Sequence, residues 1–272
     1  MKYLVTGGSG FLGQELIKRL DGEVRVLARN EANLVFLKEK FPNVEIMTGD
    51  VADSYTCDRA MQGVDGVFHL AAMKHVGLAE QNVRECINSN IPIALLEATR
   101  KYKPKFIIGI STDKAASRKG VYGTTKFLME RLFAEYEKAN PDTKYRIVRY
   151  GNVIYSTGSV LCKWRDKIKE GEPVTITDPN ATRFFWTVRQ AVDLIFECLE
   201  NATDPKPYAC PMKAIRMGDL LDVMLEKYQG TGSAINTIGL QPGENMHEII
   251  TEDGPDSSQV ERFSREEIME MI

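Results

Sequence analysis

The sequence predicts an α/β fold, a doubly wound parallel sheet with a smaller C-terminal lobe. Short apolar runs alternate with longer segments whose apolar residues return every three or four positions. The short runs are apolar throughout and not at every second residue, which is typical of parallel strands covered by helices on both faces. The composition, 43% hydrophobic and 27% charged, is that of an ordinary globular protein.

Each expected strand is a short run rich in Val, Ile, Leu, Tyr or Phe. The six strands are expected at residues 3–5, 24–27, 44–47, 66–70, 106–110 and 145–149. The segments between them have a helical period, and the five helices are expected at residues 11–20, 31–40, 53–61, 79–101 and 122–138. Residues 1–151 are therefore expected to form one parallel-sheet domain, and ligands of such sheets bind at the carboxyl ends of the strands.

After about residue 151 the alternation loosens into loops with several prolines and a basic helix near residues 163–169. Residues 152–272 are therefore expected to form the smaller lobe. The segment 187–200 is an exception, because its amphipathic period predicts that it packs back on the main sheet. A final short helix is expected at residues 265–272.

Charge and composition argue against several classes of partner. The 35 Lys and Arg residues and 38 Asp and Glu residues give a formal charge of -3, so no positive field favours nucleic acid or an anionic membrane. No run approaches the roughly 18 apolar residues of a membrane span. The five cysteines lack the spacing of a zinc site, so we expect reduced thiols and no metal. A soluble, cytoplasmic protein is expected.

A glycine-rich loop follows the first expected strand and opens the first expected helix. Gly8, Gly10 and Gly13 have the spacing of a dinucleotide fingerprint. Without Cβ atoms the backbone can turn tightly and approach a pyrophosphate. A tight structural turn is the alternative, and the strand before and helix after favour a Rossmann-type nucleotide site. The cofactor contacts expected from this loop are Gly7, Ser9, Gly10, Phe11, Leu12 and Gly13.

The end of the second expected strand bears on the choice of cofactor. A site for NAD usually has Asp or Glu here for the ribose hydroxyls, whereas this chain has Ala28, Arg29 and Asn30. Arg29 can hold a 2′-phosphate, so NADP is favoured and NAD is less favoured; the alternative is a solvated surface arginine. Asp50 and Val51, after the third strand, are expected to flank the adenine.

Tyr122 and Lys126 lie four residues apart at the start of the expected helix 122–138, which places them on one face. An ammonium beside a phenol favours the phenolate and lowers the tyrosine pKa from about 10 toward the range of an acid/base catalyst. Tyr and Lys also pair on ordinary helix surfaces, and the position downstream of the glycine loop favours catalysis.

In these motifs the chain resembles the extended short-chain dehydrogenase/reductase family, with its TGxxGxxG loop and YxxxK pair. More narrowly, it is similar to the inverting UDP-N-acetylglucosamine 4,6-dehydratases of surface-glycan and pseudaminic-acid synthesis. The shared blocks are AAMKHV at 71–76, ECI at 85–87, STDKA at 111–115, YGTTK at 122–126, RYGNV at 149–153 and GENMHE at 243–248. Thr112, Asp113 and Lys114 discriminate best, because retaining dehydratases generally have Asp-Glu in place of Asp-Lys.

The resemblance implies a reaction and a role for each of these residues. Hydride leaves sugar carbon 4, a base removes the proton on carbon 5, water leaves carbon 6, and the hydride returns there. The resemblance makes Lys114 the carbon 5 base, Asp113 the acid that assists water loss, and Tyr122 and Lys126 the oxidation pair beside Thr112. Lysine is a poor base near its usual pKa of about 10.4, so we expect a pKa of roughly 7 to 8 for Lys114. Partial burial and repulsion from Lys126, Lys74 and the oxidised nicotinamide are expected to lower it.

Further contacts are implied by the same resemblance. Beyond the glycine loop, the cofactor contacts are expected at Ala28, Arg29, Asn30, Asn33, Asp50, Val51, Leu70, Ala71, Ala72, Lys74, Asn90, Tyr122, Lys126 and Val153. The UDP-sugar contacts are expected at Lys74, Thr112, Asn152, Val160, Thr182, Arg183 and Glu244. Gln241 departs from the arginine that the family often has there, which removes one diphosphate partner.

The expected function is NADP-dependent 4,6-dehydration of UDP-N-acetylglucosamine with inversion at carbon 5. A nucleotide-sugar epimerase or 4-keto reductase on the same scaffold is the first alternative, since it needs Tyr122 and Lys126 but has no evident need for Asp113 and Lys114. A non-catalytic NADP-binding sensor is the second. The expected partners are the UDP-sugar substrate and further copies of the chain in a homo-oligomer, with no nucleic acid and no membrane.

Overall fold

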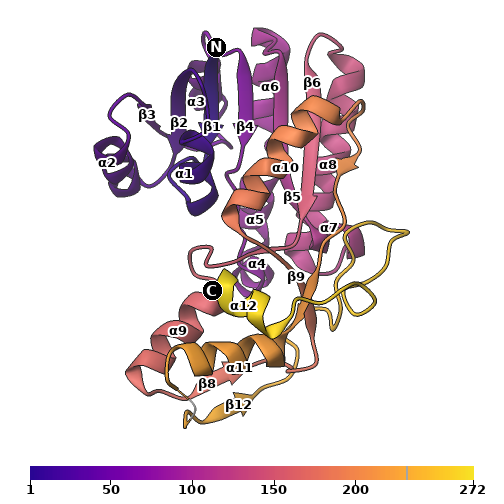
Figure 1. Cartoon of the computed structure of the whole chain (residues 1–272). Helices are drawn as coiled ribbons and strands as arrows, with labels where there is room; N and C mark the ends of the chain where they lie inside the picture. Colours follow the sequence, from indigo (N-terminus) through magenta and orange to yellow (C-terminus); the bar gives the residue numbers. More distant parts are fainter. Residues whose placement is uncertain (231) are drawn as a thin grey trace.

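Seven parallel strands form the central sheet of the computed structural model, which describes residues 1–230 and 232–272 (Figure 1). Their order is β10-β6-β5-β4-β1-β2-β3, so the order reverses between β1 and β4. The strands are β1 (Lys2–Thr6), β2 (Glu23–Ala28), β3 (Glu45–Thr48), β4 (Gly66–His69), β5 (Phe106–Thr112), β6 (Lys144–Tyr150) and β10 (Pro207–Tyr208). The predicted fold class and all six predicted strands are confirmed, and the two-residue edge strand β10 is an addition.

Helices cover both faces of this sheet. The covering helices are α1 (Phe11–Ile17), α2 (Glu31–Lys40), α3 (Ser54–Met61), α6 (Ile93–Tyr102), α8 (Gly120–Ala139) and α10 (Val188–Asn201). Three more helices, α4 (Val76–Gln81), α5 (Val83–Asn90) and α7 (Asp113–Ser117), pack against α8. Neighbouring strand residues point to opposite faces, so Val5 packs with α1, α2 and α10 while Leu4 packs with α3, α6 and α8. Both faces are buried, which explains the continuous apolar runs.

The prediction of one helix at 79–101 is wrong, because this stretch forms α4, α5 and α6. Asn82 leaves helical geometry between α4 and α5, with φ -131° and ψ 57°. Pro92 separates α5 from α6, because proline lacks an N–H and disfavours helix in the residue before it. The apolar period continues across both breaks, so it did not reveal them.

The chain after β6 builds a second group of elements. They are β7 (Asn152–Val153), α9 (Val160–Glu170), β8 (Val174–Ile176), β9 (Thr182–Trp186), β11 (Ala214–Arg216), α11 (Met217–Lys227), β12 (Ile235–Thr237) and α12 (Arg265–Met271). They form a three-stranded sheet, a two-stranded sheet and an apolar core of their own. In Figure 1 these elements lie below the main sheet, whereas α10 crosses its face.

Helix α10 begins with a capping box, in which the Thr187 hydroxyl and the Gln190 side chain each bond to the other residue's backbone N–H. Its buried face includes Val192, Leu194 and Ile195, which join the core cluster of β1, β4, β5 and β6. Among the helices of the described chain, none is both long and apolar enough to span a lipid bilayer.

Candidate active site

A cleft of about 1140 Å³ opens at the carboxyl ends of the sheet strands. One part of its wall comes from the loops after β1, β2, β4 and β5 and from the start of α8. The opposite part comes from α9, β8 and β9 of the second group of elements. The cleft therefore lies where the strand order reverses, the usual ligand site of a doubly wound sheet.

The glycine loop has a backbone conformation and a close packing that leave no room for a Cβ atom. Gly7 has φ +69°, and a Cβ there would lie 2.8 Å from the backbone N of Ala71. A Cβ on Gly13 would lie 2.5 Å from the Cα of Gly8, so the helix and the loop pack without room for any side chain. The loop residues that line the cleft are Gly7, Ser9, Gly10, Phe11, Leu12 and Gly13. A dinucleotide pyrophosphate fits such a cradle.

Beyond the glycine loop, the cleft is lined by the Arg29 side chain, which lies opposite the Asp50 carboxylate. Its Nη1 lies 3.6 Å from Asp50 Oδ2, and both side chains are substantially exposed. Asn30 uses its side-chain oxygen to accept a hydrogen bond from the Asn33 N–H at 2.9 Å, which caps α2. The residues here that line the cleft are Ala28, Arg29, Asn30, Asn33, Asp50 and Val51.

Thr112, Asp113 and Lys114 follow one another where β5 ends and α7 begins. The Thr112 hydroxyl donates to Asp113 Oδ1 at 2.7 Å, and the Lys114 backbone N–H donates to the same oxygen at 2.8 Å. Lys114 Nζ reaches that oxygen as well, at 3.1 Å. Three donors therefore converge on one oxygen of Asp113, while its Oδ2 is buried without a hydrogen-bond partner.

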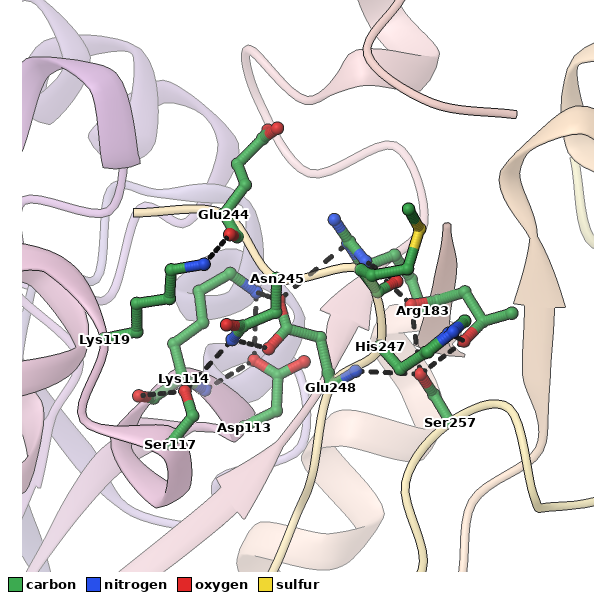
Figure 2. A network of polar contacts seen from close by, with 12 residues as sticks. Asp113, Lys114, Ser117, Lys119, Arg183, Glu244, Asn245, His247, Glu248 and Ser257 are labelled. Atoms are coloured by element: carbon green, nitrogen blue, oxygen red, sulfur yellow. Dashed lines mark hydrogen bonds and ion pairs between the residues drawn. The ribbon is translucent and has the colours of Figure 1, made fainter. Parts of the chain in front are cut away.

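The predicted lowering of the Lys114 pKa is wrong. Burial lowers this pKa, but Asp113 and Glu248 outweigh burial and raise it above its usual value. The Glu248 Oε1 atom lies 3.3 Å from Lys114 Nζ, and Figure 2 shows the ammonium between the two carboxylates. Lys126 and Lys74 were expected to repel Lys114, but the groups that surround it are Asp113, Glu248 and Arg183.

Tyr122 and Lys126 project from the first turns of α8 into the cleft wall. Burial raises the pKa of Tyr122 to about 12, with the Lys114 ammonium acting against it. Burial also lowers the pKa of Lys126 to about 8, and its Nζ donates to the Ile110 carbonyl oxygen at 2.8 Å. The prediction that Lys126 lowers the pKa of Tyr122 is therefore wrong for this structure.

Two predicted contact residues lie outside the cleft wall. Asn90 is fully buried, where its amide bonds to both the N–H and the carbonyl of Met73 and so holds the loop after β4. Thr182 is buried as well, and its hydroxyl contacts His247 Nδ1 at 2.8 Å and Ser257 Oγ at 2.6 Å. Both residues support the cleft from behind. Asp113 is likewise absent from the wall and reaches the cleft through Lys114.

The other predicted contacts lie in the cleft wall. The residues expected at the cofactor here are Leu70, Ala71, Ala72, Lys74 and Val153. Those expected at the sugar nucleotide are Lys74, Thr112, Asn152, Val160, Arg183 and Glu244. Burial lowers the pKa of Lys74.

Sequence reasoning missed Glu248, His75 and Lys163, which also line the cleft. Glu248 ends the block at 243–248, and His75 stands in the block at 71–76, so the motifs contained both signals. No group of His, Cys, Asp or Glu in the described residues could hold a metal ion.

The glycine cradle, the Tyr122 and Lys126 side chains and the strand order together define an enzyme of the extended short-chain dehydrogenase/reductase class. The chain belongs to the polysaccharide biosynthesis protein family, which matches residues 3–270. It is similar to an uncharacterized membrane protein of Methanocaldococcus jannaschii, at 37% identity over 91% of this chain and 79% of that protein.

Two named enzymes are similar at lower identity. An inverting UDP-N-acetylglucosamine 4,6-dehydratase of Campylobacter jejuni and a UDP-glucose 4-epimerase of Rickettsia akari are each 32% identical, over 91% of this chain and 76% of theirs. Among solved structures, Pen from Bacillus thuringiensis superposes with a TM-score of 0.91 at 31% identity, over 99% of this chain and 96% of that one.

Proposed function

We propose that the protein catalyses NADP-dependent 4,6-dehydration of UDP-N-acetylglucosamine with inversion at carbon 5. The product, a UDP-4-keto-6-deoxy-hexosamine, would enter surface polysaccharide or glycan synthesis. The observation that carries the proposal is that Lys114, Thr112 and Tyr122 line one cleft, with Asp113 behind the wall in contact with Thr112 and Lys114. A similar enzyme from Campylobacter jejuni is named for this reaction.

The cofactor half of the proposal depends on the glycine cradle and Arg29. Gly7 and Gly13 allow the loop and helix to pack closely into the turn that cradles a pyrophosphate, and NADP bound there would accept and return the hydride. Arg29 would hold the 2′-phosphate in place of its present contact with Asp50. The loss of NADP preference in an Arg29→Ala variant, measured by titration against NADP and NAD, would support this assignment. Equal affinity of the unaltered protein for both would oppose it.

The substrate half depends on a set of basic side chains that line the cleft. They are Lys74 and His75 of the loop after β4, Lys163 of α9 and Arg183 of β9. Burial, Lys74 and Lys163 each lower the pKa of His75, so positive charge concentrates here. This field suits the diphosphate of a nucleotide-sugar and offsets the absence of an arginine at Gln241. Asn152, Val160 and Glu244 would contact the rest of the substrate.

The reaction assigns a proton task to each group near the sugar. Tyr122, which lines the cleft together with Thr112, would take the proton of the carbon 4 hydroxyl during oxidation. Its raised pKa makes the neutral phenol the resting form, so Tyr122 has to release its own proton to solvent before it can take that of the hydroxyl. Lys114 would remove the carbon 5 proton, and Asp113 would assist the loss of water from carbon 6.

One assay separates the candidate functions. The protein is incubated with UDP-N-acetylglucosamine and NADP in deuterated water, and carbons 4, 5 and 6 are followed by NMR. A 4-keto-6-deoxy product with deuterium at an inverted carbon 5 is expected. Inversion at carbon 4 without water loss would favour an epimerase, the activity named for the Rickettsia akari relative. No turnover of any UDP-sugar would favour the NADP-binding sensor.

A further inference from the structure

Glu248 is a fully buried carboxylate beside Lys114 that the proposed reaction has not yet used. It belongs to the segment 244–248, in which Glu244 contacts Lys119, just before α8, and Asn245 contacts Ser117 of α7 (Figure 2). Its pairing with Lys114 is therefore a long-range contact, in contrast to the pairing of Lys114 with its sequence neighbour Asp113.

Both ends of the Glu248 residue are held in place. The Glu248 backbone N–H donates to Ser257 Oγ at 2.9 Å. Its Oε2 accepts a hydrogen bond from Asn245 Nδ2 at 2.8 Å, and the same amide nitrogen donates to Ser117 Oγ at 3.1 Å. These contacts tie the carboxylate to α7, the helix that carries Lys114. The orientation of Glu248 toward Lys114 is thus fixed by the surrounding structure.

The second oxygen of Glu248 is directed at two cations. Glu248 Oε1 is buried, has no hydrogen-bond partner, and lies 3.3 Å from Lys114 Nζ and 3.9 Å from Arg183 Nε. Asp113 differs, because Oδ1 already accepts from three donors that stabilise its anion. The unpartnered oxygen of Asp113 is Oδ2, whereas the oxygen that contacts Lys114 is Oδ1, so Glu248 is the carboxylate whose open acceptor position faces the ammonium.

We propose that Glu248 is a positioning residue that acts through Lys114 by taking the ammonium proton and so freeing the amine for carbon 5. This inference rests on the proposed dehydration. An N–H bond of Lys114 breaks with its electron pair left on nitrogen, and an O–H bond forms at Glu248 Oε1. The free amine then takes the carbon 5 proton, and the C–H electron pair moves toward the carbon 4 ketone.

The proton count closes over the loss of water, and the proton released from the carbon 4 hydroxyl balances the one that carbon 5 takes up when hydride returns to carbon 6. After the carbon 5 proton is removed, the cluster of Lys114, Asp113 and Glu248 holds one proton more than at the start. The carbon 6 hydroxyl needs one proton to leave as water. Its departure returns the cluster to the ammonium and two carboxylates of the resting structure.

This proton exchange predicts a distinctive pH profile. The groups that face Lys114 are Asp113 of α7, Tyr122 of α8, Arg183 of β9 and Glu248. Transfer from Lys114 to Glu248 leaves the total proton count unchanged, so the wild-type rate of carbon 5 proton removal is expected to be flat from pH 7 to 9. In Glu248→Gln the proton must leave to solvent, so the rate is expected to rise with pH.

The test uses three variants of the full chain with NADP bound. Glu248→Gln keeps the shape but removes the proton acceptor, and it is expected to lose roughly 10²-fold in carbon 5 proton removal at pH 7. Glu248→Asp restores an acceptor at greater distance, and it is expected to be intermediate in rate with a flat pH profile. Glu261→Gln alters a carboxylate on the same C-terminal segment that pairs with Lys213 at the surface, and it is expected to match wild type.

Deuterium exchange at carbon 5 reports on the base step, and the absorbance of reduced nicotinamide reports on oxidation at carbon 4. The role of Glu248 is supported if Glu248→Gln loses exchange at carbon 5, still forms reduced nicotinamide, and has an exchange rate that rises with pH. Wild-type exchange and a flat profile in folded Glu248→Gln would overturn it, as would a Glu248→Asp variant no faster than Glu248→Gln. If wild type itself does not dehydrate the substrate, the proposed function fails first, whatever the variants do.

Discussion

Replacing Lys114 by methionine keeps a side chain of similar length but removes the charge between Asp113 and Glu248. Lys114 Nζ lies 3.1 Å from one carboxylate and 3.3 Å from the other, and both acids are fully buried. Breaking a buried ion pair from one side leaves uncompensated charge and usually costs about 3–5 kcal/mol. Arg183, 3.9 Å from Glu248, then remains as the nearest cation.

The size of the stability loss depends on the least costly way to neutralise the uncompensated buried charge. One of the two carboxyls can take up a proton when the variant folds, and an unfolded carboxyl has a pKa of about 4. Holding that proton at pH 7 costs about 4 kcal/mol, and at pH 5 about 1.4 kcal/mol. Because the folded variant binds the extra proton, its stability deficit relative to wild type shrinks as the pH falls.

Urea unfolding at pH 7 and pH 5 measures this difference, and Lys105→Met, which removes an exposed partner of Asp65, serves as the control with a loss below about 1 kcal/mol. Turnover of Lys114→Met is expected to fall roughly 10²- to 10⁴-fold while NADP still binds. A variant with wild-type turnover would remove Lys114 from the mechanism. A stability deficit that is equal at both pH values would refute the electrostatic reasoning.

Three further outcomes are expected. Arg149→Met should lower the free energy of unfolding by about 3–5 kcal/mol, because Arg149 is buried and pairs with the buried Glu130 at 2.6 Å. Glu252 is the exposed partner of Arg149, so Glu252→Gln should lower the free energy of unfolding by less than about 1 kcal/mol. Burial, and to a smaller extent Lys126, lowers the pKa of His69 to about 3. The neutral His69 therefore contributes its full stability above pH 6.5, and the free energy of unfolding is expected to be about 2 kcal/mol smaller at pH 5. In urea unfolding, a His69→Asn variant should not show this decrease between pH 6.5 and pH 5. Gly13→Ala, whose Cβ meets Gly8 at 2.5 Å, should weaken NADP binding more than tenfold in calorimetry, and unchanged affinity would contradict the cradle.

The main sheet was predictable because each strand is a buried run whose neighbours also face apolar surface. Leu4 and Val5 point to opposite faces and are both fully buried, so no polar residue interrupts the run. The breaks at Asn82 and Pro92 were less visible, because the apolar period returns after each of them. Proline 92 was the one local signal for a break.

The candidate catalytic residues were visible as motifs in the sequence, but their charge environment was not. Lys114 was expected among cations because sequence motifs placed Lys74 and Lys126 in the same cleft. The decisive neighbour is Glu248, which a contact between distant parts of the chain brings to 3.3 Å. Local spacing cannot report such a contact. Asn90 shows the same limit, because it lies behind the cleft and holds Met73 instead of lining the wall.

Helix α10 ties the second half of the chain to the first. It follows β9 yet packs with Phe68, Ile108 and Val148 on the main sheet. A fragment cut at residue 151 would leave those side chains facing water, and its exposed apolar surface would favour aggregation. Isolated halves are therefore poor material for binding experiments, and any division of this enzyme has to keep α10 with the strands it shields.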